Sequence, residues 1–428
     1  MSRRIALVSE HASPLSALGG VDSGGQNVYV AQIGRRLAAM GYRVDAFTRR
    51  DDPRLPAVVE LEPGLRVVHV DAGPAAFVPK EEMLPLMDDF TAWMIDFIRA
   101  QGAYDLVHAN FFMSGLVAAR LKKSLGIPFV TTFHALGLVR LQHQGDADRF
   151  PLRRHAIEKQ VMDQSDAIIA ECPQDREDQE TLYGADPSRI HVVPCGFDAD
   201  ELWPIDRGVA RRRLGLDPAE RVVVHIGRLV PRKGVDTAIR GFARLVRRHG
   251  IEATMLVVGG ESSEPDPVVT PEIGRLAAIA QDEGVADRVR FTGRRGRADL
   301  RYYYSAADVF VTTPWYEPFG ITPVEAMACG APVIGSDVGG IKYTVVHEKT
   351  GFLVPPRDPD AVATRLAEIY LTEGLLSQMR KAAIARVNAL FTWRRVGQLI
   401  AAVYEEVLGR AARPSGEFEP AAAALEIE

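Results

Sequence analysis

Short runs of aliphatic and β-branched residues alternate along most of the chain with polar segments long enough for helices. This alternation predicts parallel strands joined by crossover helices, and it occurs twice. We therefore expect an α/β fold with two facing Rossmann-like domains and a cleft between them. Strands are predicted at residues 4–10, 42–48, 65–70, 104–110, 128–135, 166–172 and 190–195 in the first series, and at 221–228, 254–260, 288–293, 308–313, 331–337 and 350–356 in the second.

The stretch GFDADELWPIDRG separates the two series, and its Gly, Pro and acidic residues predict a hinge near residue 205. We therefore expect an N-terminal domain over 1–205 and a C-terminal domain over 206–385. After residue 358 the pattern is helical, and its last helix, over 386–410, is expected to cross back to the N-terminal domain. Residues 411–428 are acidic and rich in Ala and Pro, a composition typical of a flexible tail.

Composition narrows the class of protein. A formal charge of −5 argues against a general nucleic-acid binder, and no apolar run approaches the roughly 20 residues of a transmembrane helix. The start of the chain is interpreted as a first strand rather than a secretory signal. Its three cysteines, Cys172, Cys195 and Cys329, show neither metal-ligand nor disulfide spacing. These features predict a cytoplasmic protein, and no cofactor or metal is expected.

The stretch YEPFGITPVEA contains two glutamates, Glu317 and Glu325. Thr322 and Pro323 begin a predicted helix, in which Thr322 is the N-cap and Glu325 the third residue. Together they form a capping box, which gives Glu325 a structural role.

Glu317 lies in the loop before that helix. Phe319 and Gly320 would let the backbone approach a ligand, while the N–H groups of Gly320, Ile321 and Thr322 form the positive end of the helix dipole. A carboxylate beside an anion-binding turn suits a ligand that has both hydroxyls and phosphates, such as a sugar nucleotide. The alternative is an ordinary solvated glutamate.

A second candidate is HIGRLVPRKGVDTA, where Arg228 and Lys233 flank a turn containing Pro231 and Gly234. This spacing can direct two cations at one diphosphate, whose charge grows as its bond to a sugar breaks. Two solvated surface cations remain the alternative. The P-loop pattern is absent from the sequence.

The first loop, GGVDSGGQNVYV, is also rich in glycine. Ser23 and Gln26 are predicted to form a capping box, with Gly24 and Gly25 allowing the backbone to approach a ligand across the cleft. A plain glycine loop is the alternative, and the G-x-G-x-x-G fingerprint of dinucleotide binding is missing.

His134, in TTFHALG, follows a predicted strand and is expected to face the cleft, where it would donate to the reacting sugar or present its backbone; a purely structural histidine is the alternative. Two D-x-D strings, Asp146 with Asp148 and Asp198 with Asp200, are interpreted as solvated loop residues rather than metal ligands.

Taken together, the chain resembles the retaining glycosyltransferases of family 4, which have the two-domain GT-B fold, over residues 1 to about 410. The resemblance is carried by Glu317 and Glu325, by the turn with Arg228 and Lys233, by GGQNVYV, and by GAPVIGSDVGG followed by TGFLVPP.

The resemblance implies roles for these residues. Glu317 would hold hydroxyls of the donor sugar, Glu325 the ribose, and Arg228 with Lys233 the diphosphate. Such enzymes retain the anomeric configuration without a metal, by front-face attack in which the leaving diphosphate takes the acceptor's proton. His134 would lie beside the reacting centre, and the other donor-site residues would be Gly25, Phe319, Gly320, Ile321 and Thr322.

Within the family, the chain is most similar to enzymes with phosphorylated acceptors: the inositol-phosphate glycosyltransferases of mycothiol synthesis and the sucrose-phosphate and mannosylfructose-phosphate synthases. Lys80 and Arg154 match cations that hold the acceptor phosphate there, and Asn27 matches a polar contact. Phe111 and Ala135 stand where the inositol-phosphate enzymes have a tyrosine and a threonine, and HALG is closer to the sucrose-phosphate group.

We therefore predict a hexosyltransferase that uses a nucleotide diphosphate sugar and a small polar acceptor, expected to be a sugar phosphate, with His134 and Glu317 as catalytic residues. A nucleotide-sugar epimerase on the same fold and a non-catalytic sugar-binding protein are the alternatives, and a dehydrogenase is weaker. The nucleotide base, the hexose and the oligomeric state stay open.

Overall fold

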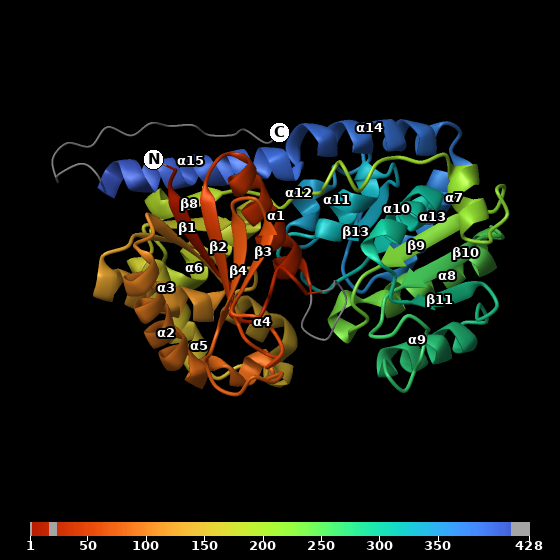
Figure 1. Cartoon of the computed structure of the whole chain (residues 1–428). Coiled ribbons are helices and arrows are strands. Elements are labelled where there is room, and N and C mark those ends of the chain that lie inside the picture. Colours follow the sequence, from red (N-terminus) through yellow and green to blue (C-terminus); the bar gives the residue numbers. More distant parts are fainter. Residues whose placement is uncertain (1, 17–23, 412–428) are drawn as a thin grey trace.

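The computed structural model describes residues 2–16 and 24–411 and consists of two α/β domains placed side by side (Figure 1). Each domain is built on one central sheet with helices on both faces. The predicted α/β architecture with two Rossmann-like domains is confirmed.

The sheet of the N-terminal domain has eight strands in the order β3-β4-β2-β1-β5-β6-β7-β8, and only β3 runs antiparallel to its neighbour. At its centre β1 pairs with both β2 and β5, so the direction of winding reverses between β1 and β5. The strands are β1 (Arg4–Val8), β2 (Arg43–Arg49), β3 (Val58–Glu62), β4 (Leu65–Val70), β5 (Leu106–Asn110), β6 (Phe129–Thr132), β7 (Ala167–Ala170) and β8 (Ile190–Val192).

The sheet of the C-terminal domain has six parallel strands in the order β11-β10-β9-β12-β13-β14, with its reversal between β9 and β12. In open sheets of this kind ligands lie beyond the carboxyl ends of the strands at the reversal. The two reversals therefore mark the place of the site. The strands are β9 (Val222–Ile226), β10 (Thr254–Val258), β11 (Val289–Gly293), β12 (Val309–Thr312), β13 (Val333–Ser336) and β14 (Gly351–Val354).

The helices follow the crossover pattern that the sequence predicts. Those of the N-terminal domain are α1 (Gly25–Ala39), α2 (Met87–Gln101), α3 (Phe112–Leu125), α4 (Gly137–Gln144), α5 (Arg153–Gln164) and α6 (Pro173–Tyr183), with short 3₁₀ turns η1 (Lys80–Glu82), η2 (Leu84–Leu86), η3 (Gly145–Ala147) and η4 (Pro187–Arg189). The remaining ones are α7 (Arg207–Arg213), η5 (Pro231–Lys233), α8 (Val235–His249), α9 (Pro271–Asp282), α10 (Arg297–Ala306), α11 (Ile321–Ala328), α12 (Ile341–Thr344), α13 (Pro359–Leu371), α14 (Leu375–Leu390) and α15 (Trp393–Ala411).

The chain passes between the domains twice, and the two passages lie side by side. Phe197 pairs with Thr392 in a parallel bridge, and the N–H of Phe197 donates to the carbonyl of Phe391 at 2.8 Å. A Cβ at Gly196 would come within 2.8 Å of that same carbonyl oxygen, so this position has no room for a side chain. The predicted hinge segment is therefore braced by the returning chain.

The last helix, α15, crosses back and packs along α1 of the N-terminal domain, as predicted (Figure 1). Its Tyr404 hydroxyl lies 2.7 Å from Nδ1 of His108, which is buried in β5. Burial lowers the pKa of His108 to about 3, so the ring stays neutral. Trp393, at the start of α15, packs edge-on against Tyr29 of α1 with ring centroids 5.8 Å apart. One buried apolar cluster accordingly runs through both domains.

Candidate active site

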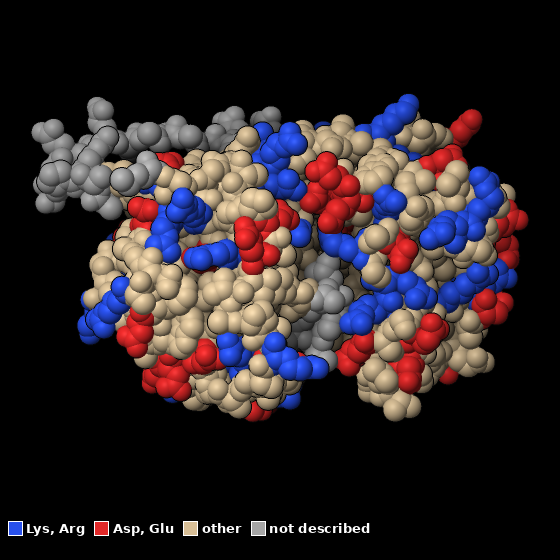
Figure 2. All heavy atoms as spheres, in the orientation of Figure 1, with Lys and Arg blue, Asp and Glu red and all other residues tan. Residues whose placement is uncertain are grey.

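A cavity of about 380 Å³ lies between the domains, at the carboxyl ends of the strands that flank the two reversals. Figure 2 shows lysine and arginine side chains gathered on the C-terminal-domain side of the furrow between the domains. From the N-terminal domain the lining includes His11, Gly25, Gln26, Asn27, Lys80, Phe111, His134, Ala135, Arg140, Phe150 and Glu171. From the C-terminal domain it includes Arg228, Arg232, Lys233, Arg294, Arg295, Arg297, Tyr304, Glu317, Phe319, Gly320, Ile321, Thr322 and Glu325.

The turn after β9 presents Lys233 to this cavity. Gly234 has a positive φ of 64°, and a Cβ there would lie only 1.9 Å from the carbonyl oxygen of Thr313. The Thr313 hydroxyl donates to the Gly234 carbonyl at 2.7 Å. Only glycine satisfies both the backbone angle and the contact, so it fixes the turn against the end of β12.

Lys233 forms an ion pair with Glu317, which joins the two loops predicted from separate stretches of sequence. Burial lowers the pKa of Lys233 below its ordinary value, although the charge of Glu317 opposes this. Burial acts to raise the pKa of Glu317, but the charges of Lys233, Arg232 and Arg228 outweigh it, and the pKa of Glu317 is lowered. The lowered pKa keeps the Glu317 carboxylate ionised at neutral pH, beside the amine of Lys233.

The loop that contains Glu317 is supported from behind by the glycines of GSDVGG. A Cβ at Gly339 would lie 1.9 Å from the Glu317 carbonyl oxygen, and a Cβ at Gly340 would lie 2.3 Å from that of Phe319. The Gly340 N–H donates to the Glu317 carbonyl at 3.0 Å. This close contact positions the loop that lines the cavity.

The capping box predicted at Thr322 is wrong. Helix α11 begins at Ile321 and its N-cap is Gly320, with a positive φ of 93° and no side-chain cap. Pro323 falls in the first turn, where its missing N–H removes no helical hydrogen bond. Because the left-handed glycine starts the helix early, Glu325 lies too far along α11 to reach the cap. The N-terminus of α11 lines the cavity, and because the first N–H groups of a helix have no acceptor within it, they can bind an anion.

The Glu325 carboxylate is buried, and it accepts hydrogen bonds from two side chains instead of capping the helix. Arg297, at the start of α10, donates to one oxygen at 2.9 Å, and the Tyr304 hydroxyl donates to the other at 2.9 Å. Arg297 also pairs with Glu201 of the linker. Since each carboxylate oxygen accepts two hydrogen bonds, Glu325 still has capacity for a ligand hydroxyl.

Helix α1 brings the glycine loop of the N-terminal domain to the opposite wall. Gly25 is its first residue, and a Cβ there would meet the side chain of Ile321 at 3.4 Å across the cleft. The capping box predicted for Ser23 and Gln26 lies partly outside the described residues, because Ser23 is not among them. The Gln26 amide donates to the Ser9 hydroxyl and to the Asn110 carbonyl.

The N-cap of α1 is Gly24, and Asn27, the third residue of the helix, closes the cap. Its side-chain oxygen accepts the N–H of Gly24 at 2.9 Å, and its amide donates to the Ser13 carbonyl at 2.9 Å. The residue lines the cavity, so the predicted acceptor contact stays a prediction.

His134 follows β6 and lines the cavity in a left-handed backbone conformation, with φ of 59°. Nδ1 lies 2.9 Å from a Glu171 carboxylate oxygen, and Nε2 lies 3.1 Å from the Asn110 side-chain oxygen. The Tyr29 ring packs edge-on against the imidazole. Positive φ at a non-glycine residue is strained and is typical of functional sites. Both ring nitrogens of His134 therefore have partners within the protein.

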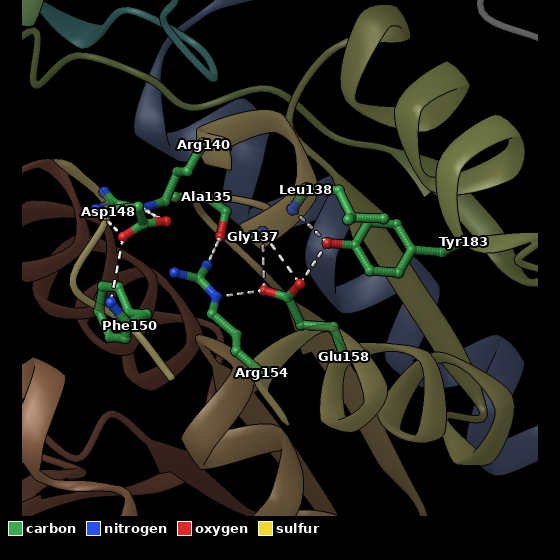
Figure 3. A network of polar contacts seen from close by, with 9 residues as sticks. All are labelled: Ala135, Gly137, Leu138, Arg140, Asp148, Phe150, Arg154, Glu158 and Tyr183. Carbon is green, nitrogen blue, oxygen red and sulfur yellow. Dashed lines mark hydrogen bonds and ion pairs between the residues drawn. The ribbon is translucent and has the colours of Figure 1, made fainter. Parts of the chain in front are cut away.

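Of the two predicted acceptor cations, Lys80 lines the cavity at η1, whereas Arg154 does not line it. Figure 3 shows Arg154 inside the N-terminal domain, between the Ala135 carbonyl and the carboxylate of Glu158. Its side chain is only 1% exposed, and Phe111 and Phe150 are among the residues that face the cavity around it.

The D-x-D strings are only partly solvated, contrary to the interpretation of the sequence. Asp146 and Asp200 are exposed, but Asp148 pairs with Arg140 at 2.9 Å and Asp198 pairs with Arg36 at 2.9 Å. Within residues 2–16 and 24–411, no three His, Cys, Asp or Glu side chains are arranged to hold a metal ion. None of the described helices has the length and apolar character needed to cross a membrane.

Comparison with known proteins agrees with this geometry. Residues 23–201 match the sequence profile described as Glycosyltransferase Family 4, and residues 206–386 match that of Glycosyl transferases group 1. A D-inositol 3-phosphate glycosyltransferase of Actinosynnema mirum is 37% identical over 411 residues, covering 94% of this chain and 97% of the relative. The chain belongs to glycosyltransferase family 4.

Two further similarities show how much of the family 4 architecture is present. A D-inositol 3-phosphate glycosyltransferase of Corynebacterium jeikeium is 35% identical over 423 residues, covering 98% of this chain and all of the relative. Among solved structures, sucrose-phosphate synthase from Thermosynechococcus elongatus gives a TM-score of 0.87 at 34% identity, covering 95% of this chain and 100% of that one. This family 4 glycosyltransferase thus has the complete GT-B fold.

Proposed function

We propose that this glycosyltransferase moves a hexose from a nucleoside diphosphate sugar to a hydroxyl of a small polar acceptor, with retention of the anomeric configuration. The observation that carries the proposal is the convergence of Lys233, Glu317 and the N-terminus of α11 on one cavity wall. A sugar diphosphate requires a cation and helix N–H groups to bind its phosphates, and a carboxylate to accept hydrogen bonds from its sugar hydroxyls.

In the proposed reaction the bond between the anomeric carbon and the diphosphate oxygen breaks, and the acceptor oxygen bonds to the same face of that carbon. The acceptor's proton passes to the departing diphosphate oxygen. Arg228, Lys233 and the first-turn N–H groups of α11 stabilise the charge that grows on the diphosphate. Glu317 accepts hydrogen bonds from hydroxyls of the hexose, and Glu325 accepts them from hydroxyls of the ribose.

On the opposite wall, Gly25 lets the backbone approach the donor, and the backbone around His134 lies beside the reacting carbon. The proposal requires no metal. For the acceptor, the relatives' names specify an inositol phosphate, and the sequence predicts a sugar phosphate bound by Lys80, Arg154 and Asn27. That narrower prediction depends on whether Arg154 can reach an acceptor.

The first experiment is thermal stabilisation of the full chain by UDP, GDP, ADP and NAD, each with magnesium or with a chelator. A ligand at 100 times its Kd adds about 2.7 kcal/mol of stability. We expect one nucleoside diphosphate to stabilise the protein with or without chelator. Stabilisation by none of the diphosphates, or by NAD alone, would contradict the proposal. An epimerase would interconvert donor sugars with no acceptor present. Incubating the same protein with the donor alone and analysing the sugars tests this alternative.

A further inference from the structure

The Glu325 carboxylate is held by an arginine and a tyrosine that fix the direction of both its oxygens. Arg297 donates to one oxygen at 2.9 Å, and the Tyr304 hydroxyl donates to the other at 2.9 Å. Burial raises the pKa of Tyr304 well above its ordinary value, so its hydroxyl keeps the proton that it donates. Glu325 is almost completely buried, and a carboxylate in such a place needs a paired cation to remain charged. Arg297 supplies that cation.

Arg297 has a second carboxylate partner outside the cavity wall. Its Nε donates to Glu201, which lies in the linker between the domains, residues 198–205. Burial acts to lower the pKa of Arg297, but the charges of Glu325 and Glu201 outweigh it, and the pKa is raised. The third nitrogen, Nη2, is covered from solvent and has no hydrogen-bond partner among the described residues. The two carboxylates therefore fix the guanidinium, and loss of either would leave it free to turn.

The linker that carries Glu201 is attached to both domains. The Glu201 N–H donates to the Asp198 carbonyl at 3.2 Å, and the Asp198 carboxylate accepts a hydrogen bond from Arg36 of α1 at 2.9 Å. On the other side, the Ile205 N–H donates to the Ser305 hydroxyl of α10 at 3.1 Å. A continuous series of contacts thus runs from α1 through the linker to the first residue of α10, which is Arg297.

From these contacts we propose that Glu201 and Arg297 are positioning residues for the ribose of the nucleotide. Glu201 holds the guanidinium, and the guanidinium holds Glu325 in the direction from which its oxygens accept the ribose hydroxyls. The inference rests on the proposed function, in which Glu325 binds the ribose. It adds that the linker takes part in recognising the nucleotide, although Glu201 itself does not line the cavity.

The test compares the nucleoside diphosphate that the stabilisation experiment selects with its 2′,3′-dideoxy analogue, which lacks both ribose hydroxyls. Isothermal titration calorimetry of the full chain measures the two dissociation constants. We expect the ribonucleotide to bind at least about tenfold more tightly, because the analogue leaves a buried acceptor without its hydroxyl. Equal affinities would overturn the inference and leave the diphosphate site standing. Failure of every nucleoside diphosphate to bind would instead contradict the proposed function.

Arg297→Lys tests the guanidinium. Lysine keeps the charge but lacks the planar fork that holds two carboxylates at fixed angles. We expect the variant to bind the ribonucleotide about tenfold more weakly and the dideoxy analogue less than about twofold more weakly. Thermal melting shows whether the variant is folded. A folded variant that loses affinity for both nucleotides equally would overturn the inference, since a purely structural role predicts that result.

Glu201→Gln tests the linker, because it removes the charge and keeps the shape of the side chain. We expect a loss of about threefold in affinity that is confined to the ribonucleotide. Glu272→Gln is the matched control: Glu272 pairs with Arg275 at 2.7 Å on α9, and neither residue is among those that line the cavity. A Glu201→Gln variant that binds both nucleotides as the control does would show that the linker plays no part, and would overturn the inference.

Steady-state kinetics separate ribose positioning from a role in the chemistry. Contacts to the ribose are made equally before and during the transfer, so the donor KM should rise in both variants while kcat changes by less than about twofold. A fall in kcat at unchanged KM would assign Arg297 to the leaving group instead, and would also overturn the inference.

Discussion

The two walls of the cavity use positive charge in opposite ways. On the C-terminal wall, Glu317 pairs with Lys233, and the charges of Arg228 and Arg232 still act on that carboxylate. On the N-terminal wall, Arg140 and Arg154 each have a carboxylate of their own. The number of arginines near a cavity therefore does not give the positive charge that a ligand meets, because ion pairs and packed side chains reduce that charge.

The backbone differs between the walls as well. The C-terminal loops are held by glycines whose replacement would place a Cβ within 2.0 Å of a carbonyl oxygen, at Gly234 and Gly339. On the N-terminal wall the positive-φ positions are occupied by the side-chain-bearing residues Phe111 and His134. One wall has loops fixed by close backbone contact, and the other has strained residues fixed by packing.

The largest expected effect comes from removing the cation that the C-terminal wall depends on. Lys233→Ala should lower kcat by about 10²-fold or more, since it deletes a preorganised donor to the leaving diphosphate. Steady-state kinetics with the selected donor measure this, and thermal melting shows whether the variant is folded. A folded variant with a near-normal rate would refute the diphosphate role and remove the contrast between the walls.

Glycine support of the same wall is tested by Gly234→Ala. The substitution combines left-handed strain with a contact to Thr313, and we expect a loss of about 3 kcal/mol in the free energy of unfolding. Gly215→Ala is the matched control: its φ is 69°, but a Cβ there meets nothing within 4 Å. Strain alone should cost about 1–2 kcal/mol in the control. Equal losses in urea unfolding would show that the contact with Thr313 contributes nothing.

On the N-terminal wall we expect a smaller change. Lys80→Ala should raise the acceptor KM by about fivefold to tenfold, the value of one hydrogen bond to the acceptor, and leave donor hydrolysis unchanged. Initial rates with varied acceptor, compared with donor hydrolysis alone, measure the two effects. If donor and acceptor constants change together, Lys80 does not belong to the acceptor end.

The smallest change expected is a shift in pH dependence. Because burial lowers the pKa of Lys233, this residue loses its proton at a lower pH than a free lysine, and activity should fall along an alkaline limb. Lys233→Arg keeps its charge at high pH, so the limb should move upward in pH even if the rate at neutral pH is reduced. A pH profile of kcat/KM for the donor gives the comparison, and identical limbs would exclude Lys233 as their origin.

The strand predictions succeeded where both faces of a strand are buried, because such strands are continuous apolar runs. Strand β3 was not predicted. Its residues Val58–Glu62 lie half exposed at the edge of the sheet, so they lack the continuous apolar run of the other strands. The two Rossmann-like domains were predictable from the alternation of strands and helices, whereas the GT-B arrangement came from the resemblance to family 4.

The site was predictable only where a loop has chemistry of its own. Glu317 and Lys233 stand in recognisable loops, but nothing in the sequence brings Arg297 and Tyr304 to Glu325; the packing of α10 beside α11 does. Glu171 had a usable signal, because it directly follows β7 at the carboxyl edge of the sheet. The neutralisation of Arg154 by Glu158, one helical turn away, also had a local signal, but its aromatic cover depends on the tertiary structure.

The return of α15 to the N-terminal domain has a consequence for the order of folding during synthesis. The N-terminal domain is completed by a helix that is synthesised after the C-terminal domain, since Trp393 and Tyr404 pack against Tyr29 and His108. N-terminal domains generally fold as soon as they are made. Here the face of α1 that α15 covers stays exposed until the C-terminal domain has also been translated, and a premature stop before Trp393 releases an N-terminal domain with an unfinished core.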